Sequence, residues 1–135
     1  VLLVHAGVVP NIVLTRMLRL PHRWDPWQRC WRPDADAFGA TLTFVKIVAI
    51  LVKAAPGNTN DVIVGGQGAT NPFVGPFGAN SHTIAVRPGG VFLIADPVGS
   101  GIGTVVAGTG DLLKIANGSS GTSVDYTIEI VGRSA

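Results

Sequence analysis

The amino-acid sequence predicts an all-β domain over residues 38–135, an antiparallel β-sandwich with a jelly-roll-like pattern of about seven or eight short strands. Short apolar runs recur every 8 to 12 residues or so, and Gly, Pro and Asn turn signals separate them, which is the spacing of sandwich strands. No helical period continues past residue 40. A chain of 135 residues can bury about two-thirds of its unfolded surface in one domain, so it can fold without a disulfide or a metal.

The longest apolar run extends from Thr41 to Ala55 and predicts the strand around which the domain is built. Lys46 and Lys53 are its only charges, so we expect it to be buried on much of both faces. It ends at the turn formers Pro56-Gly57-Asn58. Further strands are predicted at residues 61–65, 82–87, 91–95, 104–107, 112–116 and 123–132.

Residues 82–95 predict a β-hairpin with a buried second strand, because HTIAVR is followed by the turn Pro88-Gly89-Gly90 and then by VFLIA. The final strand, 123–132, shows strict alternation, which predicts one core face and one solvent face. The predicted core face carries Val124, Tyr126, Ile128 and Ile130, and the predicted solvent face carries Asp125, Thr127 and Glu129.

Two aromatic residues, Phe73 and Phe77, lie among turn formers in the loop 66–81. Because loops are mostly polar, we expect these rings either to pack inward at the end of the sandwich or to face a partner subunit. The sequence leaves both interpretations open.

Residues 1–37 differ in composition from the rest of the chain. They contain all three Trp, the only Cys and five of the seven Arg, but one Gly. Asn11 can cap a short helix up to Leu20, after which the segment is irregular. We consider three origins: translation of residues 1 to about 33 from another reading frame, an Arg- and Trp-rich arm that stacks on nucleic acid, or ordinary structural sequence. The segment is also a candidate for disorder, and the start at Val1 in place of Met fits a fragment or an incomplete reading frame.

The charge distribution argues against several classes of function. Residues 38–135 carry five Lys or Arg and five Asp or Glu, so this part is neutral and lacks the basic patch of a nucleic-acid-binding domain. Charged residues make up 13% of the chain, against about 25% in an average protein, which suits a surface covered by neighbouring subunits. No run reaches the roughly 18 apolar residues of a membrane-spanning helix.

No set of residues predicts catalysis, a metal site or a cofactor site. The run GSGIG at residues 99–103 lacks the following helix and the Lys-Ser/Thr pair of a phosphate-binding loop. His82 has no partner at zinc-ligand spacing, and no G-x-S-x-G elbow occurs. Cys30 is the only cysteine, so no intrachain disulfide can form. We therefore expect a protein that is not an enzyme and that uses no cofactor, metal or small-molecule substrate.

Residues 36–135 resemble small structural proteins of bacteriophage and prophage virions. Three motifs carry the resemblance by their order and spacing: V-R-P-G-G at 86–90, A-G-T-G-D-L-L at 107–113 and Y-T-I-E-I-V-G-R-S-A at 126–135. Proteins of this kind include β-sandwich decoration or cement proteins that sit on capsids, and they carry a further strand-like segment before D-A-F-G. If that strand is missing here, an unpaired sheet edge is exposed, which favours pairing with another chain.

The resemblance implies a non-enzymatic virion protein, with a capsid decoration or cement protein as the first expectation. A tail, baseplate or fibre-associated β domain and a carbohydrate-binding sandwich are the alternatives. We expect a homodimer or homotrimer that contacts other virion proteins such as the major capsid protein, in a virion assembled in the bacterial cytoplasm. No nucleic-acid or membrane partner is expected. The expected contact residues, chosen for their loop positions, are Phe73, Phe77, Pro88, Gly89 and Gly90.

Overall fold

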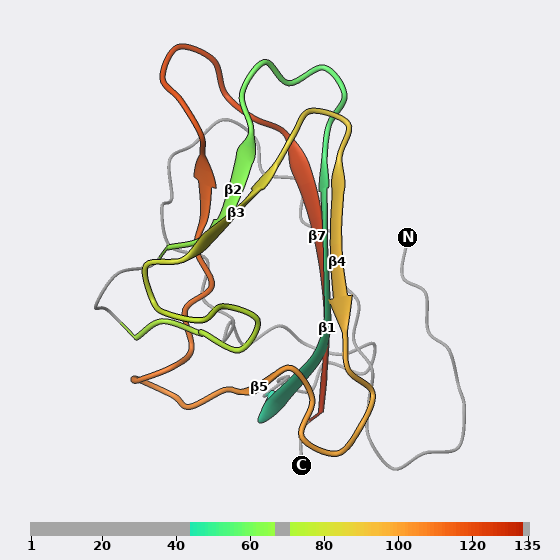
Figure 1. Cartoon of the computed structure of the whole chain (residues 1–135), viewed down its shortest axis with the longest axis vertical. Coiled ribbons are helices and arrows are strands. Elements are labelled where there is room, and N and C mark those ends of the chain that lie inside the picture. Colours follow the sequence, from blue (N-terminus) through green and yellow to red (C-terminus); the bar gives the residue numbers. More distant parts are fainter. Residues whose placement is uncertain (1–43, 67–70, 134–135) are drawn as a thin grey trace, which may run out of the picture.

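The computed structural model describes residues 44–66 and 71–133. The regular secondary structure within these residues consists of β-strands alone. The strands form two antiparallel sheets that pack face to face (Figure 1). Their bounds are β1 Lys46–Ala54, β2 Val62–Gly65, β3 Thr83–Val86, β4 Val91–Ala95, β5 Gly103–Thr104, β6 Ile115–Asn117 and β7 Tyr126–Arg133. The predicted all-β sandwich is confirmed, whereas the predicted N-terminal segment 1–37 lies outside the described residues.

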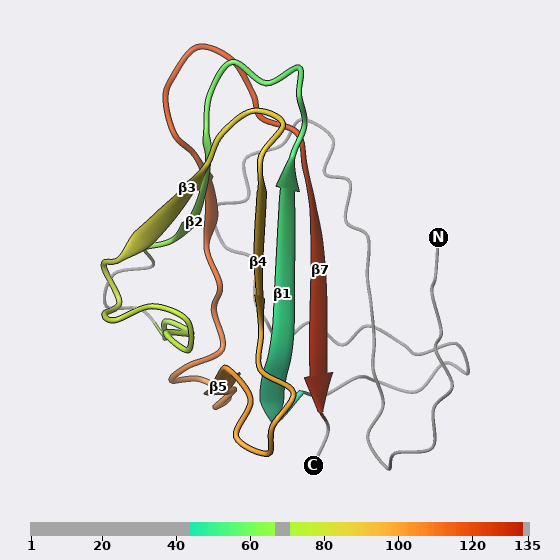
Figure 2. The same cartoon turned by 45° about the vertical axis from the view of Figure 1, so that its right-hand side comes forward.

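β1 is the centre of the first sheet, with β4 and β7 beside it (Figure 2). β7 pairs with β1 over its whole length, and β4 pairs with residues 49–53 from the opposite side. The short β5 pairs with Lys46 and Ile47 on the β4 side, because β7 occupies the other side of the same two residues. The register with β7 shifts between Ile47 and Ala49, as in a β-bulge. Among the described residues, β4 and β7 are therefore edge strands.

β2 is the centre of the second sheet, between β3 and β6. Both neighbours pair with it antiparallel. Val62 and Val64 of β2 point into the sandwich and are fully buried, while Ile63 between them is half-buried. This alternation is the period of a strand with one face on a core.

The core lies between the two sheets and consists of β-branched and aliphatic side chains. Ile47, Ile50 and Val52 of β1 form one cluster with Val62 and Val64 of β2, and all five are fully buried. Burial of a side chain of this size contributes about 1.5–3 kcal/mol. The two central strands therefore hold the sandwich together, as the length of the apolar run predicts for β1.

The hairpin predicted for residues 82–95 is wrong. β3 pairs with β2 and β4 pairs with β1, so the turn between β3 and β4 crosses from one sheet to the other. The N–H of Gly90 donates to the carbonyl of Arg87 at 2.7 Å and closes the turn. The N–H of Gly89 donates to the carbonyl of Ala55 at 3.3 Å and ties the turn to the end of β1. A Pro-Gly-Gly turn serves a hairpin and a crossover equally well, so the local sequence cannot distinguish them.

The prediction that β4 is buried is also wrong. Phe92 and Ile94 pack on the core, but Val91 and Leu93 are 59% and 63% exposed. β4 is an edge strand, and nothing in the described residues covers its outer face at these two positions. β1 is likewise buried mainly on its inner face, because its outward-facing Lys53 is exposed.

The remaining strands agree with the prediction to within a few residues. β2 falls inside its predicted range, and β7 ends at Arg133, one residue after the predicted end. The inward face of β7 carries Tyr126, Ile128 and Ile130 as expected. β5 is shorter than predicted, and β6 begins at Ile115 rather than at Leu112. The short apolar runs and the turn residues between them were therefore sufficient to locate most strands.

Candidate functional site

Phe73 lies inside the sandwich. Its side chain is 3% exposed, and its N–H donates to the carbonyl of Leu112 at 2.8 Å. The ring lies against Gly103, where an added Cβ would come within 2.9 Å of Phe73 Cζ. Of the two interpretations of this residue, inward packing describes it. Phe73 was also an expected contact residue, but its ring is buried in the sandwich and offers no surface to a partner.

Phe77 is half-buried and packs over Gly65, the last residue of β2. Gly65 has φ +93°, and an added Cβ would lie 2.9 Å from Phe77 Cε1 and 2.7 Å from the carbonyl oxygen of His82. The N–H of Phe77 donates to the carbonyl of Val74 at 2.8 Å, which holds the turn below the ring. Part of Phe77 remains at the surface, so its role in contacts stays a prediction.

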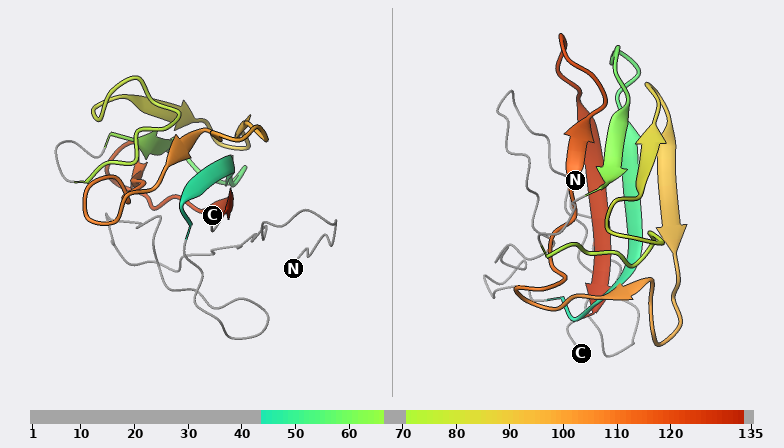
Figure 3. Two further views of the ribbon diagram at one scale, coloured as in Figure 1. Left: turned by 90° about the horizontal axis from the view of Figure 1, so that it is seen from below. Right: turned by 60° about the vertical axis from the view of Figure 1, so that its left-hand side comes forward.

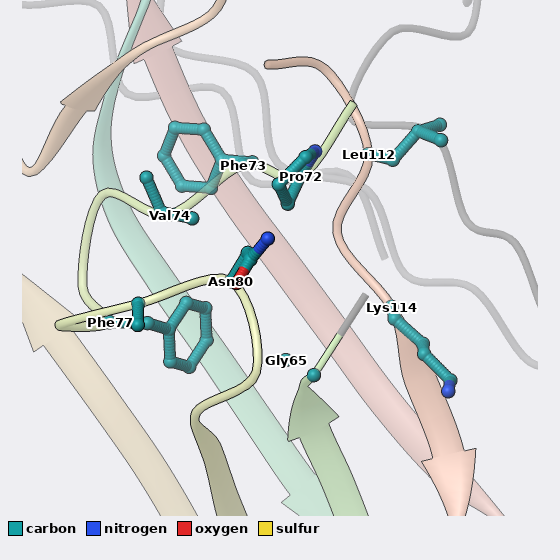
Figure 4. A pocket seen from close by; sticks show the side chains of 10 residues that line it. Gly65, Pro72, Phe73, Val74, Phe77, Asn80, Leu112 and Lys114 are labelled. Carbon is teal, nitrogen blue, oxygen red and sulfur yellow. The ribbon is translucent and has the colours of Figure 1, made fainter. Parts of the chain in front are cut away.

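The two phenylalanines line a shallow depression, shown in Figure 4. Both rings come from the loop between β2 and β3, and Leu112 and Lys114 approach from the segment that leads into β6. The depression measures about 180 Å³ including open solvent, and no part of it is wide enough for a water molecule. Small-molecule pockets measure about 300–1,000 Å³, so this depression is too small for such a ligand.

Asp111 is the one buried charged residue of the described part, at 3% exposure. Its Oδ2 accepts a hydrogen bond from the N–H of Gly108 at 3.0 Å, while Oδ1 has no partner there. This bond closes the turn Gly108-Thr109-Gly110-Asp111, which lies within the A-G-T-G-D-L-L motif. Residues 44–66 and 71–133 contain no group of three or more His, Cys, Asp or Glu that could hold a metal ion. Asp111 is therefore explained as a turn-stabilising residue.

Two cationic side chains bind the backbone of the loop after β4. The sequence alone did not indicate a role for either of them. Lys46 Nζ donates to the carbonyl of Gly99 at 2.9 Å. Arg133 Nη1 donates to the carbonyl of Val98 at 3.0 Å, and its Nη2 donates to that of Pro97. Both side chains come from paired residues at one end of β1 and β7, so the loop is held against the base of the sheet.

The opposite end of the sandwich carries a polar clamp. The turns after β1, β3 and β6 gather there (Figures 1 and 3). Asn58 exchanges two hydrogen bonds of 2.9 Å with the backbone of Asp125, through its Nδ2 and Oδ1. Asn60 Nδ2 donates to Asn117 Oδ1 at 3.0 Å and to the carbonyl of Thr122 at 3.0 Å. These amides hold the turns to one another and are used internally.

The outer face of β4 is the most exposed apolar surface among the described residues. We use the name β4 strip for its exposed residues Val91, Leu93 and Ala95 together with the exposed Val98 of the following loop. Val98, in the loop that follows β4, is 60% exposed. Leu51 of β1 lies beside Leu93 in the register and extends the apolar surface towards the centre of the sheet. Single exposed apolar residues are ordinary, but a continuous strip along one strand marks a contact surface.

The predicted contact turn Pro88-Gly89-Gly90 lies directly before the β4 strip. Pro88 and Gly89 are exposed and Gly90 is half-buried. The sequence therefore predicted contact residues next to the β4 strip. It did not predict the strip itself, because the apolar run VFLIA indicated a buried strand. The contact role of this turn stays a prediction.

The described residues contain no helix that could cross a membrane. No family model, no curated protein and no solved structure matches this chain.

Proposed function

We propose that this protein is a non-enzymatic structural component of a bacteriophage virion, a capsid decoration or cement protein that binds the capsid and self-associates. The β4 strip is the observation that supports the proposal best. Val91, Leu93 and Val98 are each about 60% exposed, in a chain whose charged residues are about half as frequent as usual. Such a surface is suited to permanent contact with neighbouring subunits.

The aromatic side chains support a structural role over a ligand-binding one. Sugar and nucleic-acid sites present exposed aromatic rings on which a ligand stacks. All aromatic residues in the described part belong to the core or pack against it: Phe44, Phe73, Phe77, Phe92 and Tyr126. The β-sandwich therefore offers no stacking platform on its described surface, which counts against the carbohydrate-binding alternative.

The position in the virion is tested by fractionation. Particles purified from lysates of cells that carry the gene are separated into heads and tails, and the protein is quantified by mass spectrometry. A fixed ratio to the major capsid protein in the head fraction is expected for a decoration protein. Recovery with tails alone would favour the tail, baseplate or fibre alternative. Absence from both fractions contradicts the virion role, and specific binding on a glycan array would then favour the binding-module alternative.

A further inference from the structure

We propose that two copies of this chain pair through the open edges of their β4 strands, antiparallel and in a register centred on Leu93. The four-stranded sheet would then continue across a twofold axis into the second copy. The inference rests on the self-association in the proposed function and gives it an interface. Four observations carry it: the direction of the backbone groups, the position of the side chains, the symmetry of the register and the absence of edge protection.

The backbone of β4 offers hydrogen-bonding groups at its open edge. On the β1 side, the N–H of Ala54 donates to the carbonyl of Gly90 at 3.0 Å, and the N–H of Asp96 donates to that of Val48 at 2.8 Å. In an antiparallel pair such bonds fall on alternate residues. Between these two positions, therefore, the even-numbered residues of β4 bond to β1. The N–H and C=O groups of the odd-numbered residues, Val91, Leu93 and Ala95, point to the open edge.

The same three residues carry the exposed side chains of β4. Val91 and Leu93 are 59% and 63% exposed, and Ala95 is exposed as well. A strand added at this edge would gain backbone hydrogen bonds and apolar contacts from the same positions. Phe92 and Ile94, which alternate with them, are already committed to the core.

The edge is complementary to itself. In a register centred on Leu93, each Leu93 lies opposite that of the second copy, and each Val91 lies opposite the second copy's Ala95. In each of these pairs, both residues point their N–H and C=O groups towards the second copy. Each pair therefore exchanges two hydrogen bonds, and the three pairs form about six. Pro88 then lies opposite the exposed Val98 of the second copy. Asp96, the only charge from 88 to 98, faces Gly90, so no like charges oppose each other.

In the part of the chain that the structure describes, this edge lacks the features with which proteins prevent such pairing. Edge strands are normally protected by Lys, Pro or a bulge, and Val91–Ala95 contains none of these. Pro88 and Pro97 flank the strand and confine the pairing to its length. Because each copy uses β4 once, the contact closes as a dimer and does not grow into a fibre. The exposed edge of β3 is less suitable, since its exposed side chains are Thr83 and Ala85.

The first test measures the dimer directly. Sedimentation equilibrium of the full chain is expected to show a monomer–dimer equilibrium. Leu93→Lys places two like charges opposite each other and removes the central apolar contact, so the dissociation constant should rise about 100-fold. Ala85→Lys adds the same charge to the exposed edge of β3 and should leave the constant unchanged. Circular dichroism verifies that both variants fold, as expected for substitutions at exposed positions.

The second test reads the register. In a Cys30→Ser background, Leu93→Cys places two thiols on residues whose Cα atoms are about 5.5 Å apart, within the range of a disulfide. Val91→Cys is the matched control, because its two copies are separated by four residues, about 14 Å along the strand. Mild oxidation is expected to cross-link Leu93→Cys into a dimer and to leave Val91→Cys monomeric.

The outcomes separate this interface from the proposed function. A wild-type chain that stays monomeric at all concentrations overturns the interface, while head and tail fractionation still decides the virion role. A wild-type dimer that survives Leu93→Lys, or equal cross-linking of both cysteine variants, overturns the β4 interface and leaves self-association intact.

Discussion

Gly65 gives the sharpest test of how the end of the sandwich is built. An alanine there must adopt φ +93°, and its Cβ would lie 2.7 Å from the carbonyl oxygen of His82 and 2.9 Å from the ring of Phe77. A positive φ costs a residue with a Cβ about 1–2 kcal/mol, and overpacking a well-filled site costs about 1–3 kcal/mol. Gly65→Ala is therefore expected to lower the free energy of unfolding by about 3 kcal/mol.

Two other glycines separate these contributions. Gly108 has φ +77° but nothing within 4 Å of an added Cβ, so Gly108→Ala should show the backbone cost alone, about 1–2 kcal/mol. Gly57 has free space and no positive φ, so Gly57→Ala should be neutral or stabilise by up to about 1 kcal/mol. Urea unfolding followed by circular dichroism measures all three. If Gly65→Ala unfolds at the same urea concentration as Gly108→Ala, the close approach of Phe77 and His82 to Gly65 is refuted.

Three further predictions concern stability. Ile50→Ala removes a fully buried side chain and should cost about 2–5 kcal/mol in urea unfolding, whereas Val106→Ala, at a half-exposed site, should stay within about 0.5 kcal/mol; equal losses would contradict the core. Asp111→Ala removes the acceptor of the Gly108 N–H and should lower the free energy of unfolding by about 1–2 kcal/mol. Asp111→Asn keeps an acceptor oxygen and should lower it less, and thermal unfolding of both variants measures the difference. Burial raises the pKa of Tyr126 to about 12, so the folded protein keeps a proton that the unfolded chain loses above pH about 10. The free energy of unfolding should therefore fall by about 1–2 kcal/mol between pH 10 and 12, after allowance for partial exposure, and the difference between wild type and Tyr126→Phe across this range measures it.

The strands themselves followed from local patterns. The alternation in β7 placed Tyr126, Ile128 and Ile130 on the core face, and the run through β1 marked the strand at the centre of its sheet. These patterns are visible in the sequence because the side-chain period of a strand repeats every two residues along the chain.

The positions of the two phenylalanines could be narrowed but not decided. The sequence showed that rings in a polar loop need apolar contacts, and it left inward packing and a partner as alternatives. Phe73 proved to be buried, and Phe77 half-buried over Gly65. The distinction depends on Gly65 and Gly103, which leave room for the rings and lie elsewhere in the chain.

By itself, the sequence determined that this chain has few charges and contains a β-sandwich, and it determined where most of the described strands lie. Only the tertiary structure decided that the turn Pro88-Gly89-Gly90 joins two sheets. It also decided that β4 is an edge strand among the described residues, with Val91 and Leu93 exposed. The physical reason is the distance along the sequence over which each feature is determined. A period or a turn is set by neighbouring residues, whereas the pairing of Lys46 with Arg133 joins opposite ends of the described chain and is decided by how whole sheets bury their apolar faces.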